Sequence, residues 1–498
     1  MYRRGSLPRL GAWRGLLDRF RSDENGSGTV FSVFGVLICL VLAGSAIDIT
    51  NAWRNRELMK ATADAAAHAG LVALVQGYEK DMVLERAKSV AEINMPYARF
   101  GPITFETVNS KEKKEAFALR HYDTRTNSLV SFGAPNAVVV TLERSRRGGN
   151  PVPTFLLRLV GFNYWDIAAR GVAVAATTKR CNTNDGIFAR GKITLASQNK
   201  IGAGFCLHSQ DAVWLPQNNT FESGSWVSVP NLEECRNKCT DVANPGIRAI
   251  SANMILADLD PYIDSIYSAF TGNDVSNLAK TSFFLSRSLD TDLSAIDEIG
   301  IKTEELKTGD IVELSPMQFS RMRELPAGLT YKVTCAQNGS GKNTVLQFGG
   351  IGAEFIMEDA ALMTNCSINF GDRAKVVGSL IVTTREQNTT TISADSGVLA
   401  GDPAQTCNTS QRTIIMSKSK LSVPADFTSS NVTLVVGDDV TIAAMPGSSD
   451  QVSKGLSIHA NGQVQIAAGH TFESCKNKSS NLIPRIQVIR LVTPTGDT

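Results

Sequence analysis

An uninterrupted apolar run near the start of the chain is the strongest pattern in the sequence. No charged residue occurs from Asn25 to Ile47, and the stretch TVFSVFGVLICLVLAGSAI holds eleven Val, Leu, Ile or Phe residues. At about −0.3 to −0.6 kcal/mol each, these residues contribute roughly −5 kcal/mol toward insertion into a bilayer. Because no proline occurs from Thr29 to Val75, we expect one helix about 70 Å long, of which about 30 Å crosses the membrane.

Small residues line one side of this expected helix. In its outer half, small or apolar residues recur at helical spacing: Leu58, Thr62, Ala65, Ala69 and Val72. Within the apolar run, small residues follow one another at four-residue intervals: Gly35, Cys39 and Ala43. Such side chains let two helix backbones approach closely, although they are also common in membrane helices generally. The pattern predicts packing against another helix or the chain's own head at five positions: Gly35, Cys39, Ala43, Ala65 and Ala69.

A mixed pattern follows the helix as far as residue 178. Alternating apolar and polar positions predict strands in ITFETV, SLVSF, AVVVTLERS and ARGVAVAAT. The stretch VPTFLLRLVG is typical of a short helix that Pro151 opens and Gly161 closes. We expect the long helix to pack on this small sheet and to bury six apolar side chains: Val138, Val140, Phe155, Leu156, Leu159 and Val174.

Beyond Cys181 the sequence contains an internal repeat. GFCLHSQDAVWLPQNNTFESG (204–224) aligns without gaps with GLSIHANGQVQIAAGHTFESC (455–475), and seven of the 21 positions are identical. Both copies hold short apolar alternations between polar turns, and residues 367–382 have a similar spacing. This spacing is typical of a parallel β-solenoid, whose stacked coils bury their apolar pairs, or of an antiparallel sandwich. We favour the solenoid, whose turns face solvent and can present a binding surface.

Charge indicates how the chain crosses the membrane. Residues 1–27 hold six arginines and three acidic residues, which leaves 44 basic and 45 acidic side chains of the 50 and 48 in the whole chain. Positive charge before the apolar run indicates a cytoplasmic N-terminus, with everything after Asp48 exported. The alternative is a cleaved signal peptide, for which AGSA (43–46) offers small residues. We expect no nucleic-acid partner, because such a protein would spread its basic residues over a folded domain.

Cysteine usage is consistent with export. Cys39 lies in the apolar run, and the other eight cysteines all follow residue 180: Cys181, Cys206, Cys235, Cys239, Cys335, Cys366, Cys407 and Cys475. An even number in an oxidising compartment predicts disulfides, although the sequence does not select a pairing. Cys235 and Cys239 are close enough to form one disulfide, to belong to two, or to serve as two of four zinc ligands.

The segment NGSGTVFSVFGVLICLVLAGSAIDITNAWRNRELMKATADAAAHAG (25–70) resembles the N-terminal region of TadE/TadG-like proteins of the Flp, or tight-adherence, pilus-assembly machinery. The matching positions are Gly26, Gly28, Asp48, Arg56, Asp64, Ala65, Ala66, Ala67, Ala69 and Gly70. Residues 121–175 are similar to the following TadG-type stretch, with its pNAV strand and npv turn. His68 stands where an apolar residue is usual, and Val33 stands where prepilin-like members have a glutamate, so we expect no prepilin cleavage.

The patterns and the resemblance together predict an α+β chain. A transmembrane helix extends into a small α/β pilin-like head, and a β-rich, solenoid-like region with a helical insertion at ANMILADLDPYIDSIYSAF follows. The expected boundaries are 1–27 for a basic cytoplasmic segment, 28–48 for the transmembrane helix, 49–178 for a TadE/TadG-like periplasmic module, 179–246 and 331–498 for two β-rich parts, and 247–330 for the helical insertion.

Candidate chemistry is sparse. His208 and His459, with Glu222 and Glu473, occupy equivalent repeat positions and would form a metal site or acid/base pair if the two copies stacked. The alternative is a repeated structural position. Because no G-x-S-x-G elbow, H-E-x-x-H helix or Walker sequence occurs, we predict no catalytic residue, cofactor or metal and no enzyme activity.

The resemblance implies a single-pass bacterial inner-membrane protein whose bulk is periplasmic and which helps to assemble or anchor an adhesive Flp pilus. Its partners would be other pilus-assembly proteins, the inner membrane, and envelope polysaccharide or outer-membrane components. The alternative function is that of an exported β-solenoid that binds or degrades polysaccharide.

Overall fold

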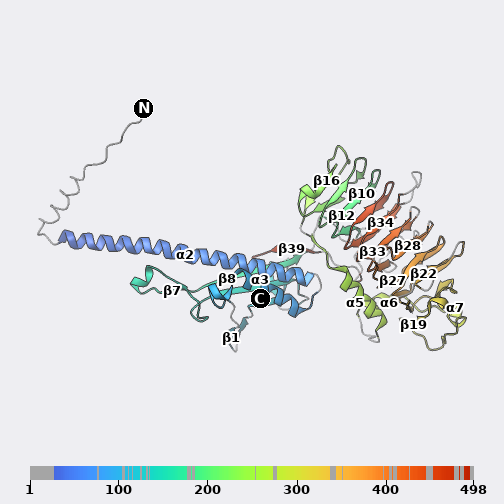
Figure 1. The fold of residues 1–498 in the computed structure, drawn as a ribbon, viewed down its shortest axis with the longest axis horizontal. Coiled ribbons are helices and arrows are strands. Elements are labelled where there is room, and N and C mark those ends of the chain that lie inside the picture. The colour runs from blue at the N-terminus through green and yellow to red at the C-terminus, as the bar shows by residue number, and fades with distance from the viewer. Residues whose placement is uncertain are drawn as a thin grey trace. The chain divides into compact units, whose positions relative to one another are not determined.

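The computed structural model of the chain describes residues 27–493 except for the following segments: 76–77, 104–106, 110–111, 115, 124–125, 131–132, 134, 177–180, 182–184, 253, 273–277, 337–343, 350–351, 388, 396, 403–406, 408–411, 425–426, 445–451, 476–481 and 483–486. The chain divides into two compact units (Figure 1). The N-terminal unit comprises Met1–Ala69, Leu84–Ala173 and Leu491–Thr498, and the C-terminal unit comprises Gly70–Val83 and Val174–Arg490.

The helices are α2 (Ser27–Val75), α3 (Lys80–Asn94), α4 (Tyr97–Phe100), α5 (Leu259–Thr271), α6 (Leu278–Phe284), α7 (Ser294–Asp297) and α8 (Pro316–Phe319), with 3-10 helices η1 (Leu157–Val160) and η2 (Leu232–Glu234). The first strands are β1 (Thr107–Asn109), β2 (Glu112–Lys114), β3 (Phe117–Asp123), β4 (Ser128–Val130), β5 (Ala137–Arg144), β6 (Val152–Pro153), β7 (Tyr164–Trp165) and β8 (Ile167–Ala176). The predicted long N-terminal helix is therefore confirmed, at 49 residues.

The N-terminal unit packs α2 on a small sheet. In that sheet β8 lies next to β5, and β3 pairs antiparallel with both β5 and β4. Val138 and Val140, on β5, are fully buried as predicted. Gly171 on β8 explains how the helix fits, because a Cβ atom there would lie 2.3 Å from the backbone carbonyl of Ala63. The backbones of helix and sheet are thus in direct contact at this point.

The side of α2 that packs on the sheet includes Thr62 of the predicted stripe but not Ala65, and packing of Ala65 and Ala69 against another helix stays a prediction. Ala63, Ala66 and Ala67 are fully buried, whereas Ala65 is exposed and Ala69 is half-buried. Successive residues on a helix are about 100° apart, so a stripe displaced by one position lies on a different face. The sequence did not distinguish these faces because alanine occurs on all of them.

The remaining strands belong to the C-terminal unit. They are β9 (Gly186–Ala189), β10 (Ile193–Leu195), β11 (Lys200–Ile201), β12 (Cys206–Ser209), β13 (Val213–Leu215), β14 (Thr220–Phe221), β15 (Trp226–Val229), β16 (Cys235–Asn237), β17 (Ala249–Ser251), β18 (Met254–Ile255), β19 (Ile311–Leu314), β20 (Glu324–Leu325), β21 (Thr330–Val333), β22 (Val345–Phe348), β23 (Phe355–Glu358), β24 (Ala361–Thr364), β25 (Ser367–Phe370), β26 (Ala374–Val377), β27 (Leu380–Thr383), β28 (Ile392–Ala394), β29 (Leu399–Ala400), β30 (Thr413–Ser417), β31 (Leu421–Val423), β32 (Thr428–Ser429), β33 (Val432–Val436), β34 (Val440–Ile442), β35 (Val452–Lys454), β36 (Ser457–Ala460), β37 (Val464–Ile466), β38 (Thr471–Glu473) and β39 (Gln487–Leu491).

Except for β18 and β39, which pair antiparallel with each other, these strands form a parallel β-solenoid with three faces, which confirms the predicted parallel β-rich region. One face is an eleven-stranded sheet in the order β17-β15-β12-β9-β36-β33-β30-β27-β24-β21-β19. The second is a nine-stranded sheet in the order β16-β13-β10-β37-β34-β31-β28-β25-β22. The third combines β14-β11-β38-β35 with β20-β23-β26-β29-β32, and a bridge between Ser430 and Lys454 joins the two parts. Apolar side chains from all three faces fill the interior.

The order of the coils does not follow the chain. Strand β9 pairs with β12 on one side and with β36, near the end of the chain, on the other. The chain therefore enters in the middle of the stack, runs to one end at β17, crosses to the opposite end at β19, and returns to the middle at β36. The two copies of the sequence repeat are coils β12–β14 and β36–β38, with the coil of β9–β11 between them. The order of the coils along the solenoid is therefore a circular permutation of their order along the chain.

A buried ion pair joins the two parts of the solenoid where they meet. The guanidinium of Arg412 lies 3.2 Å from the carboxylate of Asp185, just before β9, and both side chains are almost completely buried. Asp185 also accepts hydrogen bonds from the Ser474 hydroxyl and the Cys475 backbone N–H, and Arg412 donates to the Gly455 carbonyl. Removing one partner of such a pair is strongly destabilising, because the other charge stays buried.

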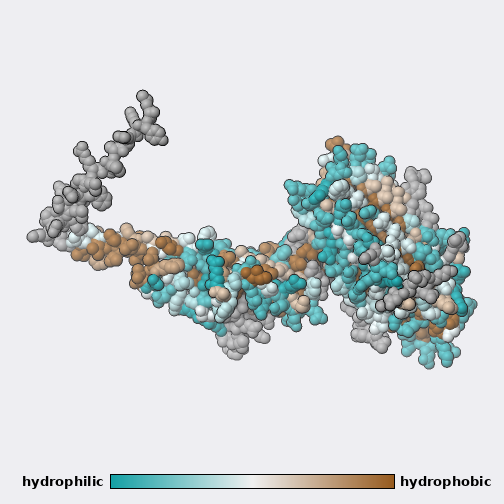
Figure 2. Space-filling view, in the orientation of Figure 1, coloured by the Kyte–Doolittle hydropathy of each residue, from teal (hydrophilic) through white to brown (hydrophobic). Residues whose placement is uncertain are grey.

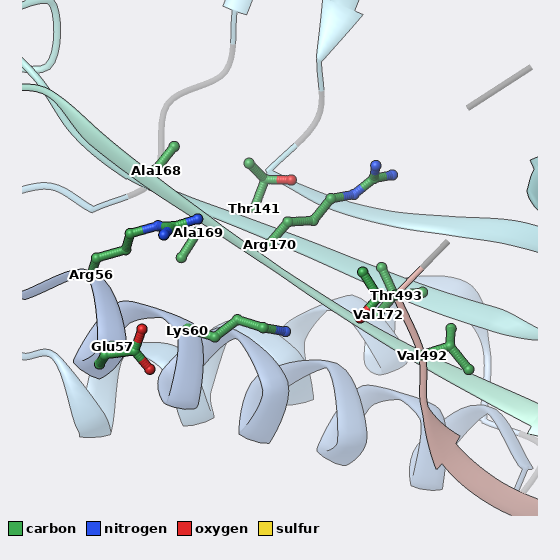
Figure 3. A pocket seen from close by; sticks show the side chains of 10 residues that line it. All are labelled: Arg56, Glu57, Lys60, Thr141, Ala168, Ala169, Arg170, Val172, Val492 and Thr493. Atoms are coloured by element: carbon green, nitrogen blue, oxygen red, sulfur yellow. The ribbon is translucent and has the colours of Figure 1, made fainter. Parts of the chain in front are cut away.

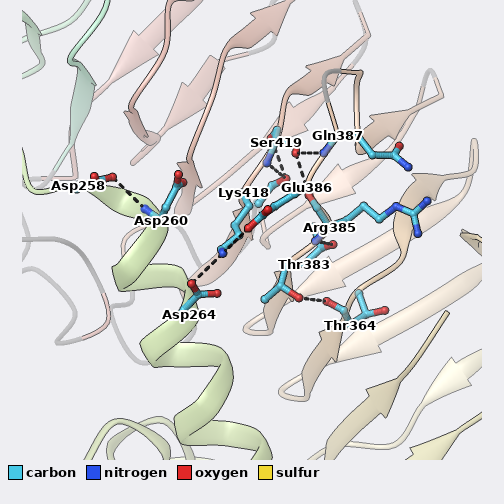
Figure 4. A network of polar contacts seen from close by, with 12 residues as sticks. Asp258, Asp260, Asp264, Thr364, Thr383, Arg385, Glu386, Gln387, Lys418 and Ser419 are labelled. Atoms are coloured by element: carbon cyan, nitrogen blue, oxygen red, sulfur yellow. Dashed lines mark hydrogen bonds and ion pairs between the residues drawn. The ribbon is translucent and has the colours of Figure 1, made fainter. Parts of the chain in front are cut away.

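The crossing segment lies over the outer face of the eleven-stranded sheet. Helix α5 contacts β21, β24, β27 and β33, and its apolar side packs with α6 on that face. Figure 4 shows Lys418 between α5 and the solenoid turns: its ammonium group lies 2.8 Å from both Asp264, on the helix, and Glu386, in a neighbouring turn. The predicted insertion, 247–330, contains these helices and also β17 to β20.

We expect Gly171→Ala to loosen the N-terminal unit, because the added methyl group cannot fit beside the Ala63 backbone. Overpacking of this kind costs about 1–3 kcal/mol. The measurement is the protease resistance of the unit in the detergent-solubilised full chain. Gly35→Ala is the matched control, since a Cβ at Gly35 has no atom within 4 Å. Equal resistance of the two variants would show that the close approach is unimportant.

Candidate functional site

The N-terminal half of α2 is an exposed apolar surface. Figure 2 shows it as a continuous hydrophobic stretch, and the exposed large side chains in it run from Val30 to Leu42. Among the residues that the structure describes, one helix, Gly28–Val75, is long and apolar enough to cross a membrane. Gly35, Cys39 and Ala43 lie on this half and are exposed, so their packing against a partner helix stays a prediction.

Asp48 connects the end of this apolar surface to the head. Its side chain is buried, and its carboxylate oxygens accept hydrogen bonds from three consecutive backbone N–H groups, those of Phe155, Leu156 and Leu157, at 2.7, 3.0 and 2.7 Å. These residues follow β6, which forms a hairpin with β7. One turn earlier on α2, a Cβ atom at Gly44 would lie 2.6 Å from the Leu156 Cβ. The hairpin tip is therefore held against the last turn of the apolar run.

The apolar side chains of this tip are not buried in the head, contrary to the sequence prediction. Phe155, Leu156 and Leu159 are exposed, whereas Val174 is buried as expected. The predicted helix here is a single 3-10 turn, η1, which Gly161 ends in a left-handed conformation. The prediction failed because the tip extends beside α2 rather than across the sheet, and an apolar pattern alone does not show which surface covers it.

A pocket of about 590 Å³ lies between α2, β8 and the segment around Val492 in the N-terminal unit (Figure 3). Its charged lining consists of Arg56, Glu57 and Lys60 from α2 and Arg170 from β8. Because three of these four side chains are cationic, the lining favours an anionic ligand.

All eight candidate cysteines form disulfides. The pairs are Cys181–Cys206, Cys235–Cys239, Cys335–Cys366 and Cys407–Cys475. Of the three arrangements considered for Cys235 and Cys239, the structure has the direct pair. Cys39 is free and exposed on α2. Every cystine therefore lies beyond the apolar helix, in the part of the chain that the sequence predicts to be exported.

The repeat residues do not come together as a site. His208 and His459 face the same row of the eleven-stranded sheet, but Phe188 of β9 lies between them. Both histidines are buried, and each ring bonds a serine hydroxyl, Ser228 for His208 and Ser457 for His459. The structure thus places them as buried structural residues on the outer side of the sheet, where the His208 ring also bonds the Met254 carbonyl.

The paired glutamates are also separate from one another. Glu222 accepts a hydrogen bond from the Ala203 backbone N–H, and Glu473 lies 3.9 Å from the Lys454 ammonium group. Across the described ranges, no group of three or more His, Cys, Asp or Glu residues is placed to hold a metal ion. The arrangement that would have made the repeat an acid/base or metal site is therefore not present at these four positions.

The outer side of the nine-stranded sheet carries a row of mostly polar side chains. The strand pairing aligns Arg236, Trp214, Thr194, Gln465, Thr441, Ser422, Ser393, Asn369 and Gln347. These nine side chains are exposed or half-buried. Two hydrogen bonds connect three neighbours in the row, from the Ser393 hydroxyl to Asn369 at 2.7 Å and from the Asn369 amide to Gln347 at 3.1 Å. It forms an extended hydrogen-bonding surface whose exposed aromatic residue is Trp214, with the Lys192 ammonium 5.1 Å from its ring centroid.

Comparisons with known proteins agree with this two-part organisation. Residues 26–73 match the family model described as "Putative Flp pilus-assembly TadE/G-like". The exposed apolar helix and this match define a chain with a TadE/G-like N-terminal segment, and they support a pilus-related role. Residues 186–476, the β-solenoid, match a second model, described as a domain of unknown function, DUF7867. Because this match covers more than half of the chain, the protein belongs to the DUF7867 family.

No curated protein matches the chain. Among solved structures, it is similar to the competence-associated pilin ComZ from Thermus thermophilus, with 8% sequence identity and a TM-score of 0.28 over 87% of this chain and 97% of that chain. A similarity at this level does not establish a shared fold.

Sequence reasoning did not identify the Asp48 contact, the hairpin tip or the polar row. Asp48 was noted as a family position, and its place directly after an apolar run could have indicated a special partner. The polar row consists of single residues in nine short strands whose stacking order is permuted, so no sequence window contains it.

We expect the stability of the C-terminal unit to fall as the pH is lowered from about 6.5 to 4. Burial lowers the pKa of His208 to about 4. Burial, together with the charge of Arg412, lowers the pKa of His459 to about 3. In this range the unfolded chain binds protons that the folded chain does not, so acid favours unfolding. The measurement is the thermal unfolding midpoint against pH.

His208→Asn is the variant for this test, since it removes one of three buried histidines whose pKa is lowered, with His459 and His470, and should flatten the pH dependence between 6.5 and 4. Asp211→Asn, at an exposed position in the adjoining turn, is the matched control and should keep the original slope. An unchanged slope in His208→Asn would contradict the assignment.

Proposed function

We propose that this protein is a non-catalytic, single-pass inner-membrane protein with a cytoplasmic N-terminus and a periplasmic bulk, and that it serves the assembly or anchoring of Flp pili. The observation that carries the proposal is the TadE/G-like match, because it falls on the apolar helix and includes Asp48, through which the helix holds its head. Attachment and positioning are therefore the functions of the N-terminal unit.

Two features support the orientation. Arginines precede the apolar run, as expected for a cytoplasmic start. Four disulfides follow it, and disulfides persist in oxidising compartments such as the periplasm. A cytoplasmic location for the solenoid would leave these disulfides reduced.

The solenoid offers the contact surfaces. The outer face of the eleven-stranded sheet is covered by α5 and α6. The side chains of the polar row on the nine-stranded sheet are exposed or half-buried, so a partner can reach them. We propose that other pilus-assembly proteins bind this face, and that envelope polysaccharide or outer-membrane components are further ligands. An extended, flat surface of amides and hydroxyls suits binding by many weak hydrogen bonds rather than by one deep pocket.

Deleting the gene should abolish or strongly reduce surface pili and adherence, and the full chain should restore both. An internal deletion of residues 181–486 keeps the anchor and the head, including β39 and Leu491–Thr498, but lacks the solenoid, so it should reach the membrane without restoring piliation. A periplasm-dependent reporter fused after Thr498 checks the orientation. Normal piliation in the deletion strain, or a reporter active only in the cytosol, would contradict the proposal.

The polar row also favours a second function, the binding of polysaccharide. Sugar hydroxyls pair with amide and hydroxyl side chains, and Trp214 supplies an exposed ring for stacking. None of the nine side chains in the row is a carboxylate, so this face favours binding and not hydrolysis.

If polysaccharide is the ligand, Trp214→Ala should weaken the binding of isolated envelope polysaccharide at least about tenfold, since loss of a central aromatic contact commonly exceeds about 1.4 kcal/mol. Leu232→Ala, an exposed apolar position outside the row, should leave binding unchanged. Equal binding by both variants, or no binding by the parent protein, would exclude this second function.

A further inference from the structure

We propose that the tip of the β6–β7 hairpin, residues 154–163, inserts into the interfacial layer of the membrane beside α2 and is a second lipid-contacting element of the chain. The inference rests on the proposed function in one respect, because it requires α2 to span the bilayer. It adds a specific partner, the acyl and headgroup boundary of the same membrane.

The depth of the tip is set by its contacts with α2. The three hydrogen bonds to Asp48 and the contact of Leu156 with Gly44 hold it at the last turn of the apolar run. At 1.5 Å per residue, Gly44 lies about 6 Å deeper than Asp48 along the helix axis. The tip therefore reaches the depth at which interfacial elements bury their apolar side chains, about 5–10 Å below the headgroups.

The composition of the tip is unusual for a solvent-exposed turn. Such turns normally carry Gly, Asn, Asp, Ser or Pro, but here Phe155, Leu159, Val160 and Phe162 are exposed, with Leu159 at 80%. Between them, Leu156 lies against Gly44 of α2, and Ile47 on the same part of α2 is exposed as well. The two elements together form one apolar surface, and because α2 enters the bilayer at this level, lipid is the neighbour that this surface meets.

Side chains beyond the tip are ordered as at a membrane interface. Tyr164 follows the apolar residues, and then come Arg146 and Asp166, paired at 2.9 Å, with the guanidinium 4.7 Å from the Tyr164 ring centroid. On α2 the same order occurs, with the exposed Trp53 followed by Arg54. From the hydrocarbon to the water, a membrane favours apolar residues first, then aromatic residues, and then charged residues. Arg158 within the tip is long enough to extend its charge to the phosphates.

The test places a fluorophore at the tip of the full-length chain. Leu159→Cys and Ile93→Cys, each in a Cys39→Ser background, are labelled with nitrobenzoxadiazole and inserted into vesicles of phosphatidylethanolamine and phosphatidylglycerol. Ile93 is similarly exposed but lies near the end of α3, outside both the apolar run and the hairpin tip. Both substitutions are at exposed positions and leave the core intact.

The tip label should show blue-shifted emission and quenching by lipids that carry a doxyl group near the headgroup, whereas the Ile93 label should show neither. The native Cys39, labelled in the otherwise unchanged chain, separates the two hypotheses, because it lies inside the span and should be quenched by lipids labelled deep in the acyl chain. A quenched Cys39 with a tip label in water overturns the hairpin inference and leaves the anchor intact. A Cys39 label in water overturns both.

A second copy of the chain is the competing occupant of the tip. In that case Leu159→Cys without a label would form disulfide-linked dimers on oxidation, with a yield that does not fall as the lipid-to-protein ratio rises. That result would also overturn the inference.

Discussion

The pairing of β9 with β36 is the contact on which the C-terminal unit depends. It joins residues from the beginning and the end of the solenoid sequence in one parallel ladder, and Asp185 and Arg412 secure it with a buried ion pair. Without this contact the coils on either side would be two short stacks with four open ends. A parallel stack is stable only where each coil has a neighbour, so the junction converts two incomplete solenoids into one.

The permuted path has a consequence for the surfaces that remain open. Because the chain must return from one end of the stack to the other, a segment has to run along the outside, and α5 and α6 do so over the eleven-stranded sheet. Apolar residues such as Met363, Leu380 and Met416, which would otherwise face solvent, are buried beneath them. On the nine-stranded sheet, by contrast, the nine side chains of the polar row are exposed or half-buried.

In the N-terminal unit, close backbone contact replaces large side chains. The backbone of α2 lies directly on β8 at Gly171. Asp48 accepts hydrogen bonds from backbone N–H groups of the hairpin tip, which would otherwise lack a partner at the end of an apolar helix. A carboxylate in this position joins the end of the exposed apolar run to the head within one turn of the helix. The apolar hairpin tip lies beside this junction.

The sequence by itself determined the features that depend on local pattern and composition. The continuous apolar run and the absence of proline set the length of α2, alternating short strands indicated a parallel solenoid, and the even number of cysteines after the apolar run indicated disulfides. The TadE/G-like resemblance, carried by Gly26 to Gly70, is likewise confirmed by the matching family model. Each of these rests on neighbouring residues, so periodicity is enough to detect it.

Tertiary structure alone decided which residues meet. The alanine-rich outer half of α2 presents small residues on every side, so only the close approach at Gly171 selects Ala63 and not Ala65 for contact. Leu159 and Val138 look alike in sequence, yet one is exposed beside α2 and the other is buried in the sheet. The repeat placed His208 and His459 at equivalent positions, but the coil of β9 separates them, because the order of the coils is a long-range property of the ladder. A local pattern shows that a side chain will be covered or paired, and only the fold shows by what.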